Sequence, residues 1–308
     1  MRNKLITFSF VIILGVVFPS IIMNAFTNRK SIQIEELENI RKKSTVVILG
    51  DNGNILELDV EEYVVGVLLA EMPASFQPHA LMAQSVLART YAYKRSETHD
   101  KHQQYALCTK STCCQGYCDV NDYSGSPQDV AKIKNAVRST KGLVLTYEGE
   151  LIEAAYFSCS GGKTEAAVAV WGMDVPYLQV VDSPGEEFAT HYQSAITLEG
   201  KVFLDKLGLS GDAVLVNNIS HTDGGGVDQI TINDITFRGT QVRQLLGLKS
   251  TAFRITITGK QVIVTVKGYG HRVGMSQYGA EAMALRGCSY AEILSHYYKG
   301  TVLTDKSL

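Results

Sequence analysis

The feature that most constrains this chain is a long apolar run near its start. Residues 5–26 form a segment of about 22 mostly apolar residues between basic flanks, which is long enough to cross a bilayer. A cleaved signal peptide is less favoured, because Met23 lies three residues before a cut after Ala25, where a small residue is preferred. We therefore expect an uncleaved membrane anchor, with a buried core helix as the alternative.

The expected anchor divides the rest of the chain into a tail, a stalk and a domain. Basic residues flank it on both sides, so charge specifies its orientation only weakly. The short tail, residues 1–4, is most simply left in the cytoplasm. We then expect a charged stalk over residues 27–44 and an extracytoplasmic domain over residues 45–308, in a single-pass protein of the cell membrane.

Composition narrows the function of that domain. The 308 residues are 45% hydrophobic, which is enough for a sizeable core. The formal net charge of −2 and the isoelectric point near 6.4 provide no basic field for a polyanion. We therefore do not expect nucleic acid as a partner.

Strands and helices alternate irregularly along the domain. The clearest helix starts at Pro78, and the Asn52-Gly53 pair predicts a hairpin. Further helices are expected at residues 61–70, 128–142, 202–208, 239–247 and 277–298, and further strands at residues 143–149, 150–158, 227–239 and 253–268. The pattern predicts an α+β fold with mixed, mostly antiparallel sheets and helices that form a cleft.

One carboxyl group, Glu71 in the stretch "LLAEMPASF", stands between an apolar run and Pro73. A chain reversal at this join can present the side chain to a cleft, and apolar neighbours raise the pKa of a carboxyl as a general acid requires. The alternative is a helix-end glutamate that pairs with Arg89 or accepts a hydrogen bond from an amide. Arg89 itself suits substrate binding or a solvated helix face.

Two polar, glycine-rich segments resemble ligand loops. They are "YFSCSGGKTEAAVAVWG", residues 156–172, and "KGYGHRVGMSQYGA", residues 267–280. Glycines let backbone amides approach a ligand closely, although each segment could also be only a tight loop. Cys159 and His271 could form a thiol and its base, but nothing in their spacing requires it.

A cysteine-rich insertion spans residues 99–126. It contains His99, His102, Cys108, Cys113, Cys114 and Cys118, and thiolate and imidazole are the preferred ligands of Zn²⁺. We expect Zn²⁺ on His102, Cys108, Cys113 and Cys114, with Cys118 as a substitute ligand and His99 as a weaker one. Disulfides are the alternative, since the domain is expected outside the cytoplasm.

Three of these stretches together resemble a known family. "LLAEMPASF…LMAQSVLARTYAYKR", "YFSCSGGKTE…VWG" and "GYGHRVGMSQYGAEAMA" are similar to motifs of the stage II sporulation protein D family, which shares its domain with amidase enhancer proteins. The resemblance covers residues 46–298. Members that act in sporulation are lytic transglycosylases, which cut the glycan strands of peptidoglycan during engulfment of the forespore. The resemblance therefore implies that Glu71 is the single catalytic acid.

The resemblance also implies which residues hold the sugars. They are Arg89, Tyr156, Ser160, Lys163, His271, Ser276, Gln277 and Tyr278. Two positions depart from the family pattern, because Cys159 replaces a small polar residue and Arg272 replaces a glycine. The insertion is not universal in the family, so Zn²⁺ would be structural and of a clostridial type.

Partners and rival functions follow from the same resemblance. Expected partners are glycan strands, an amidase named stage II sporulation protein P and the membrane protein stage II sporulation protein M, at the mother-cell membrane that faces the septal or engulfing wall. A non-catalytic glycan-binding amidase enhancer is the main alternative. Zinc-dependent hydrolysis is the third, and it predicts activity that needs the metal but not Glu71.

Overall fold

The computed structural model describes residues 44–50 and 53–306. The predicted tail and anchor, and all of the stalk except Ser44, lie outside these residues. In the part that the structure does describe, no helix has both the length and the apolar character needed to span a membrane. The described residues from Val46 to Lys306 belong to one compact unit.

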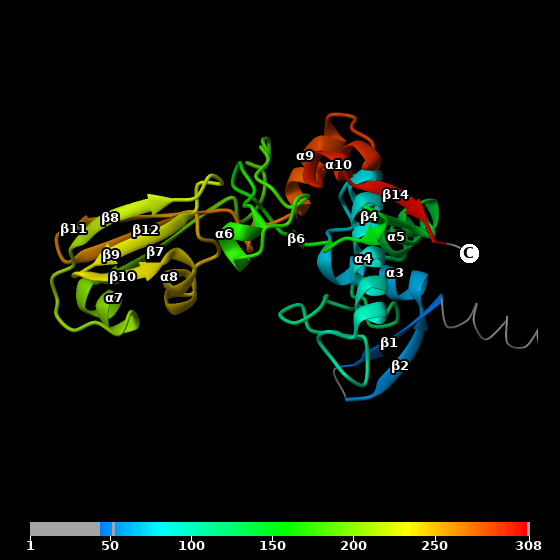
Figure 1. Ribbon diagram of the computed structural model, residues 1–308, viewed down its shortest axis with the longest axis horizontal. Coiled ribbons are helices and arrows are strands. Elements are labelled where there is room, and N and C mark those ends of the chain that lie inside the picture. The colour runs from blue at the N-terminus through cyan, green and yellow to red at the C-terminus, as the bar shows by residue number, and fades with distance from the viewer. Residues whose placement is uncertain (1–43, 51–52, 307–308) are drawn as a thin grey trace, which may run out of the picture. The chain divides into compact units, whose positions relative to one another are not determined.

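Helices and strands follow one another irregularly, as the sequence predicts (Figure 1). The helices are α3 (Val60–Glu71), α4 (Pro78–Thr98), α5 (Pro127–Ser139), α6 (Ala167–Trp171), α7 (Gly200–Lys206), α8 (Gly239–Leu246), α9 (Gln277–Leu285) and α10 (Tyr290–Tyr297). The strands are β1 (Thr45–Leu49), β2 (Ile55–Asp59), β3 (Leu107–Cys108), β4 (Leu143–Tyr147), β5 (Glu150–Leu151), β6 (Tyr156–Phe157), β7 (Gln193–Glu199), β8 (Val216–His221), β9 (Val227–Ile232), β10 (Ile235–Arg238), β11 (Phe253–Thr258), β12 (Gln261–Lys267), β13 (Met275–Ser276) and β14 (Val302–Asp305).

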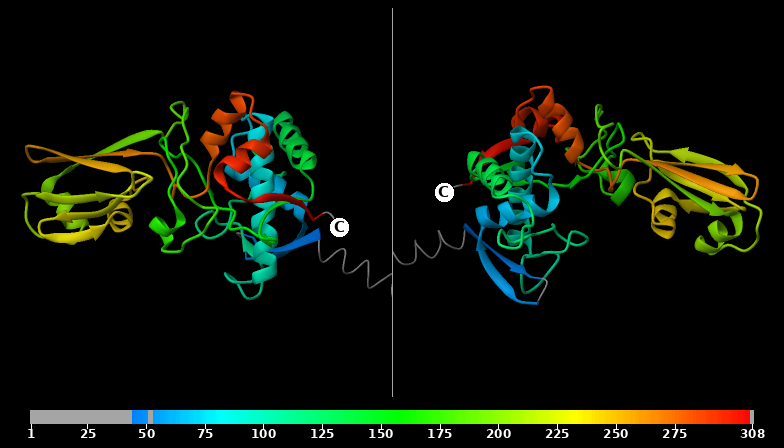
Figure 2. Two further views of the ribbon diagram at one scale, coloured as in Figure 1. Left: turned by 45° about the horizontal axis from the view of Figure 1, so that its top comes forward. Right: turned by 180° about the vertical axis from the view of Figure 1, so that it is seen from behind.

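Helix α4 is the centre of the larger hydrophobic core. It begins with Pro78 in its first turn, where the missing N–H costs nothing, and ends at His99 in the left-handed conformation with φ 48°. Helices α3, α5, α9 and α10 and strand β4 all pack against it, and the views in Figures 1 and 2 show them around it. Small side chains such as Ala80, Ala83 and Ala88 are fully buried, which allows this close packing.

A second, smaller core lies under the strands of the chain's second half. The strand order β11–β12–β7 forms one antiparallel sheet and β10–β9–β8 another. Phe203 of α7 and Val242 of α8 are fully buried with Ile230 and Val264 of the strands. The alternation of buried and exposed residues along β12 is the pattern that a sheet with one packed face requires.

The predicted α+β class and the mostly antiparallel pairing are confirmed. Among the named strands of the described residues, parallel pairs occur only where β1 meets β3 and β13 meets β6, and one isolated parallel bridge joins Glu165 to Val273. The turn at Glu148 and Gly149 joins β4 to β5, and both residues have positive φ. The helical region expected over residues 277–298 is confirmed, but it is divided into two helices, because Gly287 at φ 89° follows the end of α9 and Ser289 caps α10.

Candidate active site and metal cluster

Glu71 is the last residue of α3 and faces a cavity. Asp59 caps the start of this helix by accepting hydrogen bonds from the Glu61 and Glu62 amides, and Met72 ends it in an extended conformation before Pro73. The cavity has a volume of about 770 Å³. The helix-ending break therefore places Glu71 where the sequence predicts, at a cavity wall.

The cavity is built from segments that are far apart in the sequence. Its lining includes Glu71, Tyr91, Arg95, Asp100, Lys101, Cys113, Cys114, Gln115, Glu153, Tyr156, Trp171, Met173 and His271. The structure thus brings together the predicted acid, two predicted groove residues and two predicted metal ligands. Trp171 is 39% exposed, so the cavity has an aromatic face that a sugar ring can stack on.

Glu71 differs from the other two acids of the cavity. Asp100 and Glu153 form ion pairs with Arg95 at 2.5 and 2.6 Å. Within the described residues Glu71 has no ion-pair partner, and it accepts a hydrogen bond from the Gly116 amide at 2.6 Å. Burial raises the pKa of Glu71, and the Gly116 amide opposes this shift. The neutral acid is therefore favoured over a wider pH range than in an exposed glutamic acid.

Gln115 connects the buried Tyr63 to the partly buried Tyr156 beside this acid. The Tyr63 hydroxyl donates to Gln115 Oε1 and Gln115 Nε2 donates to the Tyr156 hydroxyl oxygen, both at 3.1 Å. Because Tyr156 already accepts from the amide, its own proton is free to donate to another acceptor. Burial raises the pKa of Tyr156, so the hydroxyl stays protonated. Gln115 cannot be recognised from the sequence, since a glutamine inside "CCQGYC" carries no periodic or motif signal.

His271 supplies a neutral ring to the cavity. Burial, with the Arg243 charge as a second cause, lowers the pKa of His271 to about 4. Its Nδ1 accepts from the Val273 amide at 3.1 Å, and its ring contacts Trp171 with centroids 5.3 Å apart. His271 therefore lines the cavity as a neutral group.

The assignment of Arg89 to the groove is wrong. Its side chain is fully buried and binds Glu61 through two hydrogen bonds of 2.8 and 2.6 Å. It also donates to the carbonyl oxygens of Leu143 at 2.9 Å and Val137 at 3.4 Å. Arg89 therefore fastens α4 to α3 and to the chain after α5, and it pairs with Glu61 rather than Glu71.

The remaining expected sugar contacts do not line this cavity. Ser160 is fully buried and donates to Glu186 Oε1 at 2.7 Å, and Ser276 is fully buried as the cap of α9. Gln277 is buried at the start of α9, and Lys163 is exposed near Asp182 at 3.6 Å. Tyr278 packs against Phe76 and Phe188. The polar residues of these two segments mainly serve the fold, because their hydrogen bonds connect neighbouring loops.

The contacts of Arg272 explain how an arginine can stand where the family pattern has a glycine. The residue keeps the left-handed backbone of a glycine, with φ 67°, while its side chain is buried. Its guanidinium binds Glu165 Oε1 at 3.2 Å and three backbone carbonyls, those of Ser160, Lys163 and Gly224. These charge-assisted bonds offset the cost of the positive φ. The loop shape is thus retained with arginine.

Cys159 is not placed as a nucleophile. Its side chain is fully buried, and its thiol donates to Glu186 Oε2 at 3.0 Å. Burial and the nearby Glu186 charge raise the pKa of the Cys159 thiol well above its usual value. A thiolate attack by Cys159 therefore has no support in this geometry.

The four predicted metal ligands form one cluster. One ligand atom from each of His102, Cys108, Cys113 and Cys114 lies within 4.8 Å of the others. His102 Nε2 lies 3.5 Å from Cys113 Sγ and 3.4 Å from Cys114 Sγ, and the two thiols are 4.0 Å apart. Zn–S bonds of about 2.3 Å in a tetrahedron separate ligand atoms by roughly 3.5–3.8 Å. These four residues could therefore hold a metal ion.

The alternatives for the insertion are less well supported. All six cysteines of the sequence lie in the described residues and are unpaired. Cys118 donates to the Asp119 carbonyl at 3.4 Å and His99 ends α4, so neither belongs to the cluster. A set of three thiols and one imidazole suits Zn²⁺.

Comparison with known proteins identifies the family of this chain. The model of the family described as "SpoIID: Stage II sporulation protein" matches residues 50–147, which include Glu71 and the insertion. Stage II sporulation protein D of Bacillus amyloliquefaciens is 36% identical over 271 residues, covering 85% of this chain and 79% of that protein. The chain belongs to the stage II sporulation protein D family.

Two further relatives are a second stage II sporulation protein D and an amidase enhancer. Stage II sporulation protein D of Bacillus subtilis is 36% identical over 263 residues, covering 82% of this chain and 77% of the relative. The amidase enhancer of the same organism is 31% identical over 301 residues, covering 78% of this chain but only 40% of the longer relative. The stage II sporulation protein D family thus includes this chain, and the domain is shared with amidase enhancers.

Proposed function

We propose that this protein is a peptidoglycan lytic transglycosylase that acts in sporulation, with Glu71 as its catalytic acid and base. The observation that carries the proposal is that Glu71 lines a large cavity, has a raised pKa and is the one carboxyl among the described lining residues without an ion pair. Membership of the stage II sporulation protein D family supports the sporulation role.

A single acid is sufficient for this reaction. The Glu71 carboxyl donates its proton to the glycosidic oxygen between N-acetylmuramic acid and N-acetylglucosamine, and the bond to the muramic acid C1 breaks. The resulting carboxylate then takes the proton of the C6 hydroxyl, and the C6 oxygen bonds to C1. The 1,6-anhydro ring forms without water and Glu71 regains its proton. An ordinary glycosidase would instead require two carboxyl groups.

Neighbouring residues would hold the sugars. The Tyr156 hydroxyl can donate to a substrate oxygen, and Trp171 offers a face to an apolar sugar surface. His102, Cys108, Cys113 and Cys114 would hold structural Zn²⁺, which would fix the loop that carries Gln115 and Gly116. In this proposal Zn²⁺ supplies rigidity to the loop and takes no part in bond cleavage.

The test is the product of the purified full chain. In detergent, it should convert peptide-stripped glycan strands to fragments that end in 1,6-anhydro-N-acetylmuramic acid, detected by mass spectrometry. Glu71→Gln should lose this activity by at least about 10³-fold, while Glu187→Gln, at an exposed position outside the cavity lining, should keep it. Absence of anhydro product, or full activity of Glu71→Gln, would refute the assignment.

A non-catalytic role is the second candidate, because one relative is named an amidase enhancer. On this alternative the same cavity binds glycan strands and stimulates a separate amidase. It predicts that wild type and Glu71→Gln bind stripped strands and enhance the amidase equally, with no anhydro product. Zinc-dependent hydrolysis, the third alternative, predicts hydrolytic products that vanish with the metal but persist in Glu71→Gln.

Location and partners belong to the same proposal. Residues 5–26 would anchor the chain in the mother-cell membrane, with the domain facing the septal or engulfing wall. The partners would be peptidoglycan strands and stage II sporulation proteins P and M. Protease accessibility of the domain in intact protoplasts tests the orientation, since a cytoplasmic domain would be protected.

A further inference from the structure

A further pocket lies at one end of the antiparallel sheet β11–β12–β7, with residues of β8 in its wall. Its volume is about 390 Å³, and it shares no lining residue with the cavity of Glu71. Its polar lining residues are Gln193, His221, Arg254, Thr265 and Lys267. We call it the sheet pocket.

The strand register brings the polar side chains of the sheet pocket together. Arg254 of β11 is paired with Thr265 of β12, and Lys267, two residues further along β12, is paired with Gln193 of β7. Successive side chains of a strand point to opposite faces, and Val266, between the last two residues of β12 named here, is buried in the smaller core. The four polar side chains therefore lie on the solvent face of the sheet.

The sheet pocket is basic and has no acid among its lining residues. Arg254, Lys267 and His221 line it, the last of these from the edge strand β8, and all three are exposed. None of them forms an ion pair with an acid of the described chain. Asp223 and Asp228 are the nearest acids that follow His221 along the chain, and neither lines the pocket. The charge that the pocket presents to a ligand is therefore positive.

The two permanent cations of the sheet pocket repel each other. Arg254 and Lys267 occupy diagonal positions of one strand pair, and like charges at neighbouring positions of a sheet face are destabilising. Neither side chain has a hydrogen-bond acceptor or an acid partner within the described chain. Solvation alone is the simpler account of two exposed cations. It does not require His221 to reach the same pocket from a strand of the other sheet, whereas a bound anion would contact all three.

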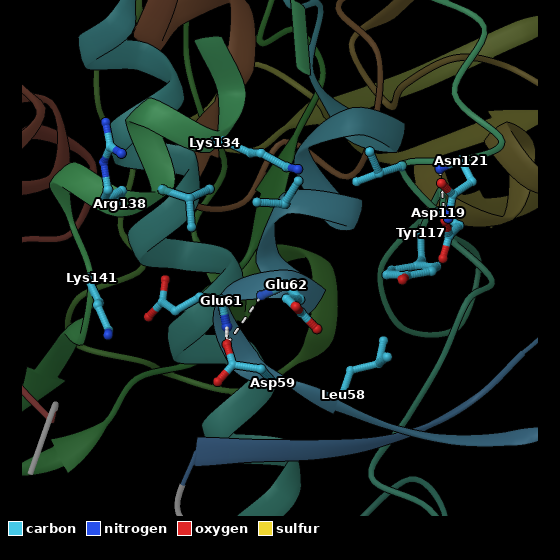
Figure 3. A pocket seen from close by; sticks show the side chains of 13 residues that line it. Leu58, Asp59, Glu61, Glu62, Tyr117, Asp119, Asn121, Lys134, Arg138 and Lys141 are labelled. Carbon is cyan, nitrogen blue, oxygen red and sulfur yellow. Dashed lines mark hydrogen bonds between the residues drawn. The ribbon is translucent and has the colours of Figure 1, made fainter. Parts of the chain in front are cut away.

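The cavity between α3 and α5 has a different charge pattern (Figure 3). Acids and cations both line it, and they are Asp59, Glu61, Glu62, Asp119, Lys134, Arg138 and Lys141. Because the two signs occur together there, that cavity selects no ligand charge. The sheet pocket, which has one sign alone, selects an anion.

A short segment joins the sheet pocket to the Glu71 cavity. Lys267 lines the pocket and His271 lines the cavity, and four residues of chain span at most about 14 Å. Tyr269 lies between them and is 36% exposed, and its backbone forms two hydrogen bonds with that of Cys159, of 3.1 and 2.7 Å. A polymer bound in the cavity can therefore continue along this fixed segment to the sheet pocket.

We propose that the sheet pocket binds a lactyl carboxylate of a peptide-stripped glycan strand whose scissile bond lies in the Glu71 cavity. Each N-acetylmuramic acid has this group, which is a neutral amide while the stem peptide is attached and a charged carboxylate once the peptide is removed. The two oxygens of the carboxylate accept from the Arg254 guanidinium, and the Lys267 ammonium adds a second charge. The proposal rests on the proposed function for the identity of the polymer. It adds a contact, distant from the bond that breaks, that favours stripped strands.

Strands that differ only in the lactyl charge test the proposal. The substrates are stripped strands and the same strands with their carboxylates coupled to methylamine, and the enzyme is the full chain in detergent. Combined Arg254→Gln and Lys267→Gln should raise KM for the charged strands about fivefold, with kcat unchanged, because the contacts are exposed charges. The same double variant should have the wild-type KM for the methylamide strands. An equal effect on both substrates, or on neither, overturns the proposal.

A matched variant controls for the loss of two positive charges. Lys206→Gln combined with Lys260→Gln removes two exposed lysines that do not line the sheet pocket, and it should leave KM for both substrates unchanged. Both double variants should keep the wild-type melting temperature, since surface substitutions without partners change stability little. The effect of the Arg254 and Lys267 substitutions should also shrink when salt is raised from about 50 to 500 mM. An effect of equal size in the matched variant would contradict the assignment to this pocket.

A phosphate polymer of the wall is the competing anionic ligand. The probe is poly(glycerol phosphate), added to Glu71→Gln and followed by calorimetry beside stripped strands, which this variant should bind without cleavage. Binding of the stripped strands that weakens in the Arg254 and Lys267 background supports the proposal. Binding of the phosphate polymer with no dependence of strand binding on these two residues assigns the pocket to the other polymer and overturns it.

The catalytic proposal and the sheet-pocket proposal fail separately. Calorimetry needs no turnover, so it tests the pocket even in a chain that is inactive. If no anhydro product forms but strand binding depends on the lactyl charge and on Arg254 and Lys267, the catalytic assignment fails and the pocket stands. If anhydro product forms with the same KM in wild type and in the double variant, the reverse holds.

Discussion

The Gly116 amide donates a hydrogen bond to Glu71 Oε1 at 2.6 Å. Gly116 follows the cluster residues Cys113 and Cys114 within one loop, so the loop that can hold a metal also touches the proposed catalytic acid. A Cβ on Gly116 would lie 2.9 Å from Glu71 Oε1 and 3.4 Å from the Ala70 Cβ. Glycine therefore allows the amide to approach, and the position of Glu71 depends on the shape of this loop.

Removing the metal should lower turnover, although in this proposal the metal takes no part in bond cleavage. Chelation is expected to loosen the loop and displace the Gly116 amide, and a misplacement of about 1 Å can cost about 10²-fold in rate. Anhydro-product formation before chelation, after it and after addition of Zn²⁺ checks this, with metal content measured in parallel. Gly116→Ala is the matched variant, since it should impair kcat while the purified protein keeps its metal. Full activity of the metal-free chain would contradict the prediction.

Activity should fall as pH rises through the raised pKa of Glu71. The protonated carboxyl is the form that donates to the glycosidic oxygen, and burial raises the pKa of Glu71 above the range of an exposed glutamic acid. The alkaline limb of the kcat/KM profile should therefore lie above that range. The control is the melting temperature over the same pH interval, which should not fall together with activity. A limb at the ordinary pKa of glutamic acid would show that Glu71 is not desolvated in solution.

Patterns within short stretches of the sequence predicted the features that depend on residues close together in the chain. The helix after Pro78, the turn at Glu148 and Gly149, and the four clustered ligands all follow from spacing, backbone preference or ligand type. The break before Pro73 likewise placed Glu71 at a helix end facing a cavity. In each case the deciding residues are near neighbours in the sequence.

The sequence did not reveal partners that are distant along the chain. Arg89 looks like a surface charge or a sugar ligand, and its burial follows from Glu61 and from carbonyl groups about 50 residues later. Gln115 acquires its role only because Tyr63 and Tyr156 lie on either side of it. Ser160 and Ser276 share a motif with cavity residues but bond to the protein itself, which a motif cannot distinguish.

Replacing Gln115 should act through Tyr156. In Gln115→Leu the Tyr156 hydroxyl loses its donor and can turn its proton away from the cavity, so we expect kcat to fall about tenfold. The melting temperature should also fall, because the buried Tyr63 hydroxyl loses its acceptor. In Gln115→Glu, kcat should fall further, because the introduced carboxylate would accept a hydrogen bond from the Tyr156 hydroxyl and keep that proton from the substrate. Kinetic parameters on stripped glycan strands provide the measurement.

A double-mutant cycle separates this role from a packing effect. If Gln115 acts by orienting the hydroxyl, Gln115→Leu should have little further effect in a Tyr156→Phe background. Additive losses in the double variant would mean that Gln115 supports the loop independently of Tyr156.

Arg89 should contribute stability rather than substrate affinity. Arg89→Ala leaves the Glu61 carboxylate and the Leu143 carbonyl without their buried partner, so the free energy of unfolding should fall by about 3 kcal/mol, the lower end for a broken buried pair because Glu61 is 20% exposed. Chemical denaturation gives this value, and KM measured where the variant is still folded should match wild type. The control is Lys306→Ala, which breaks an exposed pair with Glu97 and should cost less than about 1 kcal/mol. A rise in KM with unchanged stability would instead return Arg89 to the glycan-binding groove, and would require its guanidinium to leave Glu61.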